Sequence, residues 1–301
     1  MKNIDDNQIC SSFRKWMKAI RIQHWIKNVL VFVPSIANHS IFDIKVLINS
    51  TICFFLFSLC ASSVYLINDL YDIEADLKHP IKRRRPIAAG EISKKSAITV
   101  ALSMIVSIFF VTLMLSVKLL YMLCIYLFVA IVYSKYLKKL LIIDVITLAL
   151  LYCFRIIAGG IATQIQISVW LISFAAFFFL SLAFLKRHNE LLTFRLGTST
   201  DNLGRSYLHD DIQFLEQLGV NMGVASTIVF ALYITDSGTR ASYSNPQILF
   251  LLLPIMIYWL SMNWLLAHRK TQSDDLVVNL LNDKVLLLLV PLTIAIVFIA
   301  I

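Results

Sequence analysis

Long apolar runs, separated by shorter polar segments, cover most of the chain. The runs are apolar on every face rather than striped, which water does not tolerate on a helix surface. A bilayer core takes about 20 mainly apolar helical residues, so the runs predict membrane-spanning helices. The nine expected helices cover residues 24–41, 46–67, 97–116, 119–134, 141–162, 168–185, 218–235, 247–266 and 285–301. The first run is the weakest, because Lys27, Asn28 and Pro34 interrupt it.

Composition supports the same class. Of the 301 residues, 59% are hydrophobic and only 15% are charged, and the mean hydropathy is +0.78. A soluble domain carries about 25% charged residues, so the composition excludes a soluble globular protein. We therefore predict an all-α, polytopic membrane protein with about nine transmembrane helices. It comprises an N-terminal arm (residues 1–23) and a single transmembrane domain (residues 24–301).

The distribution of positive charge predicts the orientation. Most of the 27 Lys and Arg residues lie in the N-terminal arm and in every second segment between the runs. Cytoplasmic loops carry such an excess of Lys and Arg, so the N-terminus is expected inside the cell and the C-terminus outside. The protein is expected in the cell (inner) membrane. The net charge of +9 thus mostly reflects the orientation of the chain in the membrane, and nucleic acid is not an expected partner. The long cytoplasmic loops, 68–96, 186–217 and 267–284, are where function is expected.

An acidic segment (residues 68–76) directly follows the second run. Asn68, Asp72 and Asp76 are spaced by four, so on a helix they project from one face with about 6 Å between neighbours. Stacked oxygen side chains repel one another unless a cation lies between them. Mg²⁺ suits such a site, because it accepts one or two carboxylates and completes its shell with water and phosphates. Asp69 and Glu74 lie off this face, as supporting partners or as solvated side chains.

A cationic turn (residues 78–90) comes next. Its Lys and Arg side chains suit the remaining oxygens of a metal-chelated diphosphate, with Lys78, Lys82 and Arg85 as candidate contacts. The alternative is that the acids mark a helix end and the basic run only anchors the topology. The proximity of the two segments at a membrane face favours the binding site. Arg83 and Arg84 are equally compatible with solvent or lipid headgroups.

The Asn-Asp-x-x-Asp-x-x-x-Asp pattern, followed by Lys/Arg and Arg-Pro, resembles the UbiA superfamily of intramembrane prenyltransferases over nearly the whole chain. The resemblance implies nine helices around a central cavity and a prenyl diphosphate bound through magnesium. Within the superfamily, the chain most resembles the decaprenyl-phosphate phosphoribosyltransferase branch. The supporting stretches are residues 21–28, His79-Pro80, residues 133–138 with Asp144-Val145 and residues 155–160, and Arg269 through Asp274-Asp275 to Lys284.

One departure from the superfamily supports this branch. Aromatic prenyltransferases of this superfamily carry a second Asp-rich motif after the sixth helix, but here that position reads Leu-Lys-Arg-His-Asn-Glu at residues 185–190. The acids further along lack the spacing of that motif. One acidic cluster with additional cations fits two anionic substrates, a phosphorylated sugar diphosphate and a lipid phosphate.

The resemblance implies a magnesium-dependent transfer from 5-phosphoribosyl 1-diphosphate to a polyprenyl phosphate. Asn68, Asp72 and Asp76 are the expected catalytic and metal-binding residues. The lipid phosphate is already ionised at neutral pH, so no general base is expected. The candidates for substrate binding are Lys27, Lys78, Lys82, Arg85, Lys135, Lys138, Lys186, Arg187 and Glu190.

Arg155 lies within an apolar run, where a cation faces a cavity or a partner. Asp144 is about three turns away on a similar face, so a structural arrangement of the two is as well supported as a substrate role. Gly159-Gly160 indicates close helix packing rather than a phosphate cradle.

Two other functions are compatible with these residues. The first is a conventional prenyltransferase that moves a prenyl group to an aromatic or lipophilic acceptor. The second is a transporter or lipid carrier. The cationic stretch at residues 185–190 disfavours the first, and the position of the acidic segment at a membrane face rather than the midplane disfavours the second. No residue pattern specifies an oligomeric state.

Overall fold

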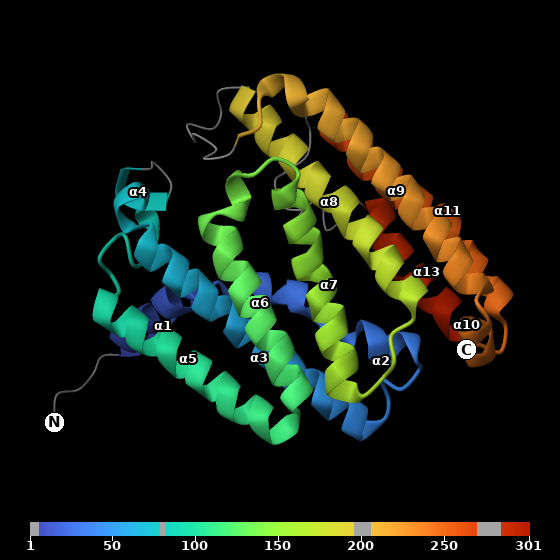
Figure 1. Cartoon of the computed structure of the whole chain (residues 1–301), viewed down its shortest axis with the longest axis horizontal. Helices are drawn as coiled ribbons and strands as arrows, with labels where there is room; N and C mark the ends of the chain where they lie inside the picture. The colour runs from blue at the N-terminus through green and yellow to red at the C-terminus, as the bar shows by residue number, and fades with distance from the viewer. Residues whose placement is uncertain (1–5, 79–81, 196–205, 270–283) are drawn as a thin grey trace. The chain divides into compact units, whose positions relative to one another are not determined.

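The computed structural model describes residues 6–78, 82–195, 206–269 and 284–301, and these residues form helices and connecting turns without β-strands (Figure 1). Seven of the described helices are long and apolar enough to cross a membrane, so the chain is a multi-pass membrane protein. These are α3 (Ile44–Tyr71), α5 (Lys94–Leu115), α6 (Val117–Lys135), α7 (Ile143–Thr163), α8 (Val169–Arg195), α9 (Ile212–Thr235) and α11 (Leu252–His268). They coincide with seven of the nine apolar runs.

The first and last runs form different elements. The first begins as a 3-10 helix, η1 (Ile22–Phe32), which the short helix α2 (Val33–Ala37) follows. Pro34 lies in the first turn of α2, where its missing N–H is tolerated. The last run forms α13 (Lys284–Ala300), of which Leu288–Ala300 is a shorter apolar helix.

The remaining elements are shorter, and all but the N-terminal α1 lie between the helices already named. They are α1 (Asp6–Ala19), α4 (Ile73–Lys78), η2 (Lys82–Arg84), η3 (Leu137–Lys139), η4 (His209–Asp211), α10 (Ser237–Ser242) and η5 (Pro246–Leu251). The predicted loop at 267–284, with its Asp274-Asp275 and Asp283 residues, lies almost wholly outside the described residues, as does His79-Pro80.

The chain divides into two compact units, and each is described by itself. Unit 1 contains Met1–Leu137 and Phe154–Gln166, and unit 2 contains Lys138–Cys153 and Ile167–Ile301. The single transmembrane domain expected over residues 24–301 therefore stays a prediction.

In unit 1, polar side chains of α3 bind the 3-10 segment. The Trp25 Nε1 donates to Ser62 Oγ at 3.0 Å, and Asn28 Nδ2 donates to Ser58 Oγ at 2.9 Å. Water is absent from a bilayer core, so polar groups there need partners within the protein. The interruption of the first run by Asn28 thus has a structural reason, because that side chain is buried and bonded.

Arg155 is a second polar anchor of unit 1. Its Nε donates to Asn28 Oδ1 at 2.8 Å, one of its Nη atoms donates to Tyr126 Oη at 3.3 Å, and the rings of Phe57 and Tyr126 lie 5.4 Å from its guanidinium carbon. Asp144, eleven residues earlier on the same helix, is displaced by about 16 Å along the axis. The hypothesis of a direct Asp144–Arg155 arrangement is therefore wrong, and Asp144 binds other partners in unit 2.

Gly159 allows α7 to approach the backbone of η1. A Cβ atom at this position would lie 2.0 Å from the carbonyl oxygen of Val31, which no side chain tolerates. The prediction that this glycine permits close helix packing is confirmed.

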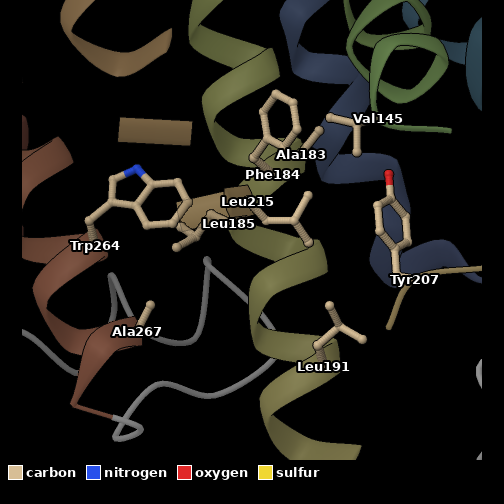
Figure 2. Packing of buried hydrophobic residues seen from close by; sticks show 9 residues of the cluster. All are labelled: Val145, Ala183, Phe184, Leu185, Leu191, Tyr207, Leu215, Trp264 and Ala267. Carbon is tan, nitrogen blue, oxygen red and sulfur yellow. The ribbon is translucent and has the colours of Figure 1, made fainter. Parts of the chain in front are cut away.

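In unit 2, α8 packs along α9 and α11. A Cβ on Gly219 would lie 2.1 Å from the ring of Trp264, whose Nε1 donates to Ser181 Oγ at 3.1 Å, and Ser181 in turn donates to the Gly219 carbonyl at 2.7 Å. Figure 2 shows the buried cluster around this contact. It consists of Val145, Ala183, Phe184, Leu185, Leu191, Tyr207, Leu215, Trp264 and Ala267.

We predict that Gly159→Ala destabilises unit 1 by about 1–3 kcal/mol or more, as overpacking does, because the backbone of Val31 must move. The measurement is thermal unfolding of the purified protein in detergent. Gly223→Ala is the matched control, because its Cβ would meet the Ser181 hydroxyl at 3.2 Å and no backbone atom among the three nearest. Equal melting temperatures for the two variants would contradict the close-packing role.

Candidate functional site

The acidic segment lies at the end of α3, where the helix bends. α3 ends at Tyr71, Asp72 caps it, and α4 begins at Ile73. The backbone spacing continues through the bend, because the N–H of Asp72 donates to the Asn68 carbonyl at 2.9 Å and the N–H of Asp76 donates to the Asp72 carbonyl at 2.8 Å. The Asn68 Nδ2 donates to the Asp72 carboxylate at 3.0 Å. Asn68 and Asp72 are thus direct neighbours, as their spacing predicts.

Asp76 is buried and faces a cation. Its carboxylate accepts a hydrogen bond from Arg85 Nη1 at 2.8 Å, an ion pair between the acidic segment and the cationic turn. Within the described residues, no group of three His, Cys, Asp or Glu side chains lies close enough to hold a metal by itself.

The donor chemistry of the acidic segment nevertheless fits Mg²⁺. Asn68 and Asp72 supply an amide and a carboxylate within 3.0 Å of each other, and Asp76 follows one turn later. Mg²⁺ takes oxygen ligands and is usually held by one or two carboxylates together with substrate phosphates and water. A complete protein cage is therefore not required.

Asp69 is the acid whose importance the sequence pattern does not reveal. It is buried, and its Oδ1 accepts from an Nη atom of Arg21 at 2.7 Å and from Arg85 Nη1 at 3.1 Å. The alternative that Asp69 is a solvated side chain is therefore wrong. Glu74, for which the same alternative was open, is exposed. Asp69 precedes the bend and lies about 100° around the helix from Asn68, which turns it toward the segment before η1.

The cationic turn is fixed by its own backbone and apolar residues. The N–H of Ile92 donates to the Pro86 carbonyl at 3.0 Å, and Lys18 donates to the Arg84 carbonyl at 3.2 Å. Ile87 and Ile92 are buried in a cluster with Leu66 of α3. A further cluster member is Ala19, so the end of α1 packs there too.

The individual cations of this region differ in exposure. Arg83 and Arg84 are exposed, Lys82 is half-buried, and the side chain of Lys78 lies outside the described residues. Lys135, at the end of α6, lies over the ring of Tyr71 with 3.9 Å between its Nζ and the ring centroid.

Two further candidates, Lys27 and Lys138, lie in different units. Lys27 lies half-buried in η1, which belongs to unit 1. Lys138 lies in η3 and is the first residue of unit 2, half-buried.

In unit 2, the predicted loop at 186–217 begins as helix. α8 continues through Arg195, ten residues beyond the expected end of the sixth run, because buried Leu191 and Leu192 extend its packing face. The expectation of a loop is therefore wrong for residues 186–195, and Lys186, Arg187 and Glu190 lie on a helix.

Arg187 and Asp144 form the buried ion pair of unit 2. The Arg187 Nε donates to an Asp144 side chain that is 0% exposed, and Arg187 Nη1 donates to Glu190. The Tyr207 hydroxyl donates to the other Asp144 oxygen at 2.5 Å and accepts from the N–H of Ile142 at 2.8 Å. Burial, together with the bond to Asp144, raises the pKa of Tyr207, so the phenol remains a donor at neutral pH.

This arrangement separates the two adjacent cations of α8. Lys186 is exposed, whereas Arg187 is held between two carboxylates. The position of Tyr207 could not be predicted, since it lies 63 residues from Asp144 in the chain and belongs to no local motif.

Comparison with protein families gives one match over most of the chain. Residues 29–282 match the UbiA prenyltransferase family. Decaprenyl-phosphate phosphoribosyltransferase from Mycobacterium tuberculosis is 35% identical over 80% of this chain and 80% of that protein. The uncharacterized protein y4nM from Sinorhizobium fredii is 34% identical over 90% of this chain, which spans about half (53%) of its length.

Solved structures show the same fold. A UbiA homologue from Archaeoglobus fulgidus, bound to GPP and Mg²⁺, superposes with a TM-score of 0.68 at 16% identity, over 95% of this chain and 99% of that one. A second match is a structure described as digeranylgeranylglyceryl phosphate synthase, with a TM-score of 0.66 at 15% identity, over 96% of this chain and 98% of that one. With a family match over most of its length and this fold, the chain belongs to the UbiA prenyltransferase family.

Proposed function

We propose that this membrane-embedded transferase moves 5-phosphoribose from 5-phosphoribosyl 1-diphosphate to a polyprenyl phosphate and releases pyrophosphate. The observation that carries the proposal is that Lys186 lies exposed on α8 where a second acidic motif would otherwise lie, beside Arg187, which is paired with Asp144. Additional cations suit two anionic substrates, whereas a neutral aromatic acceptor needs none. The identity of 35% to the mycobacterial phosphoribosyltransferase supports the same choice.

The acidic segment would bind the diphosphate of the donor through Mg²⁺. Asn68, Asp72 and Asp76 provide the oxygen ligands, and Arg85 and Lys82 lie in the turn that follows. When bound, the metal ion neutralises negative charge on the departing diphosphate. Arg85, already bonded to Asp76 at 2.8 Å, is placed to donate to a phosphate oxygen nearby.

The reaction needs no proton transfer to begin. An oxygen of the ionised lipid phosphate attacks C1 of the ribose from the face opposite the diphosphate. The C1–O bond to the diphosphate breaks as the new C1–O bond forms, and the diphosphate leaves with the bonding electron pair. The task of the protein is therefore to position two anions and to stabilise the leaving group.

The charge pattern supports a site on the cytoplasmic face of the cell membrane. The acidic segment, the cationic turn and the basic ends of α6 and α8 all lie in the segments that carry the excess of Lys and Arg. The N-terminus would then be cytoplasmic and the C-terminus outside.

Product analysis tests the choice of donor. Purified protein with ribose-labelled 5-phosphoribosyl 1-diphosphate, polyprenyl phosphate and Mg²⁺ is expected to move label into the lipid fraction. Label that stays in the aqueous fraction, while labelled prenyl diphosphate is consumed with an aromatic acceptor, would establish the conventional prenyltransferase reaction instead.

Asp72→Asn tests the metal role. We expect turnover to fall about 100-fold or more, as when one group that stabilises developing charge is removed. The melting temperature should change little, because Asp72 is only half-buried at a bend. Glu74→Gln is the matched control, since it removes one acid two residues further along the chain, in α4, where the side chain lies exposed. Equal activity of the two variants would contradict the assignment.

A pair of variants on α8 separates binding from folding. Lys186→Gln should leave the melting temperature unchanged and raise the KM for one of the two anionic substrates, by about tenfold for one lost charged contact. Arg187→Gln should instead destabilise the protein by about 3–5 kcal/mol, because it leaves the buried Asp144 carboxylate without its cation. Steady-state kinetics and unfolding in detergent measure the two effects. An unchanged KM for both substrates in Lys186→Gln would remove that residue from the site.

A further inference from the structure

Asp69 joins two arginines that are far apart in the chain. Arg21 precedes η1 and Arg85 ends the Arg-Pro run, yet both donate to the same Oδ1 atom of Asp69, at 2.7 and 3.1 Å. The Asp69 side chain is only 3% exposed, whereas those of Arg21 and Arg85 are 19% and 25% exposed. The carboxylate is thus covered, while both arginine side chains remain partly accessible to solvent.

Arg21 is held in place by more than this ion pair. Its guanidinium carbon lies 4.5 Å from the centroid of the Tyr65 ring, and its carbonyl accepts from the N–H of His24 at 2.9 Å. Its backbone is left-handed, with φ 54° and ψ 51°, a conformation that costs a non-glycine residue about 1 kcal/mol or more. A conformation of this kind persists only where its surroundings determine it, and such positions cluster at ligand sites.

Arg85 is shared between two carboxylates. Its Nη1 donates to Asp69 and also to Asp76 at 2.8 Å. In the proposed function Asp76 is also a metal ligand, so its carboxylate would be shared between Arg85 and Mg²⁺. Asp69 keeps Arg85 beside the acidic segment, because it lies one residue after Asn68 on the same helix.

We propose that Asp69 is a positioning residue that holds Arg21 and Arg85 as a pair of guanidinium donors for the diphosphate group of the donor substrate. This inference rests on the part of the proposed function that both UbiA-type reactions share, a diphosphate bound at the acidic segment. Two oriented guanidinium groups can each donate two parallel hydrogen bonds to phosphate oxygens, which a lysine cannot.

The direction in which Asp69→Asn changes the affinity for an anion distinguishes a positioning role from a purely electrostatic one. Removing a carboxylate near an anion site lowers repulsion, so Coulomb's law predicts that Asp69→Asn binds an anion more tightly. Positioning predicts weaker binding, because the two arginines lose their common anchor. A purely structural role predicts a lower melting temperature with unchanged affinity of the folded protein.

The test is calorimetric titration of the full-length protein in detergent with inorganic pyrophosphate at saturating Mg²⁺. We expect Asp69→Asn to weaken binding about 10- to 100-fold, the equivalent of losing one or two charge-assisted hydrogen bonds. Glu74→Gln, which removes an exposed acid nearby, is the control and should bind pyrophosphate as the unmodified protein does. Equal or tighter binding by folded Asp69→Asn would overturn the proposal, as would the absence of binding by the unmodified protein.

Arg21→Lys decides the matter if Asp69→Asn does not fold. This variant keeps the positive charge and loses the planar fork, so we expect about tenfold weaker binding at an unchanged melting temperature. An unchanged affinity would overturn the proposal. Pyrophosphate is the leaving group of both UbiA-type reactions, so the titration does not depend on which donor the enzyme uses. If the phosphoribosyl assignment fails, label is missing from the lipid product, but the unmodified protein still binds pyrophosphate and Asp69→Asn still binds it more weakly.

Discussion

A buried carboxylate is stable only when cations or donors surround it, and the described structure buries three of them, of which Asp76 shares Arg85 with Asp69. Asp69 in unit 1 binds Arg21 and Arg85, and Asp144 in unit 2 binds Arg187 and Tyr207. The desolvation of an isolated charge costs several kcal/mol, which neither site could sustain without these partners. Each pairing also fixes the direction of an arginine. The burial of Asp69 therefore determines where the partly exposed Arg21 and Arg85 lie, whereas Asp144 holds Arg187 inside unit 2.

The helices provide the rigid frame for this arrangement. α3 carries serine side chains that bind Trp25 and Asn28 of the 3-10 segment, and Arg155 continues the same network. Gly159 brings α7 against the Val31 carbonyl. Because these contacts fix η1, they also fix the residue that precedes it, Arg21. Packing within the membrane and charge placement at its face are thus parts of one structure.

Most of the helices and part of the candidate site could be predicted from the sequence. The features that could not be predicted depend on contacts between residues far apart in the chain. Apolar runs predict seven of the long helices, because length and hydropathy are local properties, and the i, i+4 spacing places Asn68 beside Asp72. The pairing of Arg21 with Asp69 spans 48 residues and has no local signature. The continuation of α8 to Arg195 depends on tertiary packing of Leu191 and Leu192. The polarity of the segment by itself predicts a loop. Local sequence patterns thus predict the helices, whereas the buried ion pairs can be identified only once the fold is known.

The central claim is that the end of α3 binds a divalent cation together with a diphosphate. Crystals grown with Mn²⁺ and pyrophosphate test it directly, because Mn²⁺ prefers the same oxygen ligands and gives an anomalous signal. The account predicts an anomalous peak within coordination distance of the Asp72 carboxylate, with diphosphate density between that peak and Arg85. A peak elsewhere in the molecule, or diphosphate density remote from the acidic segment, would contradict it.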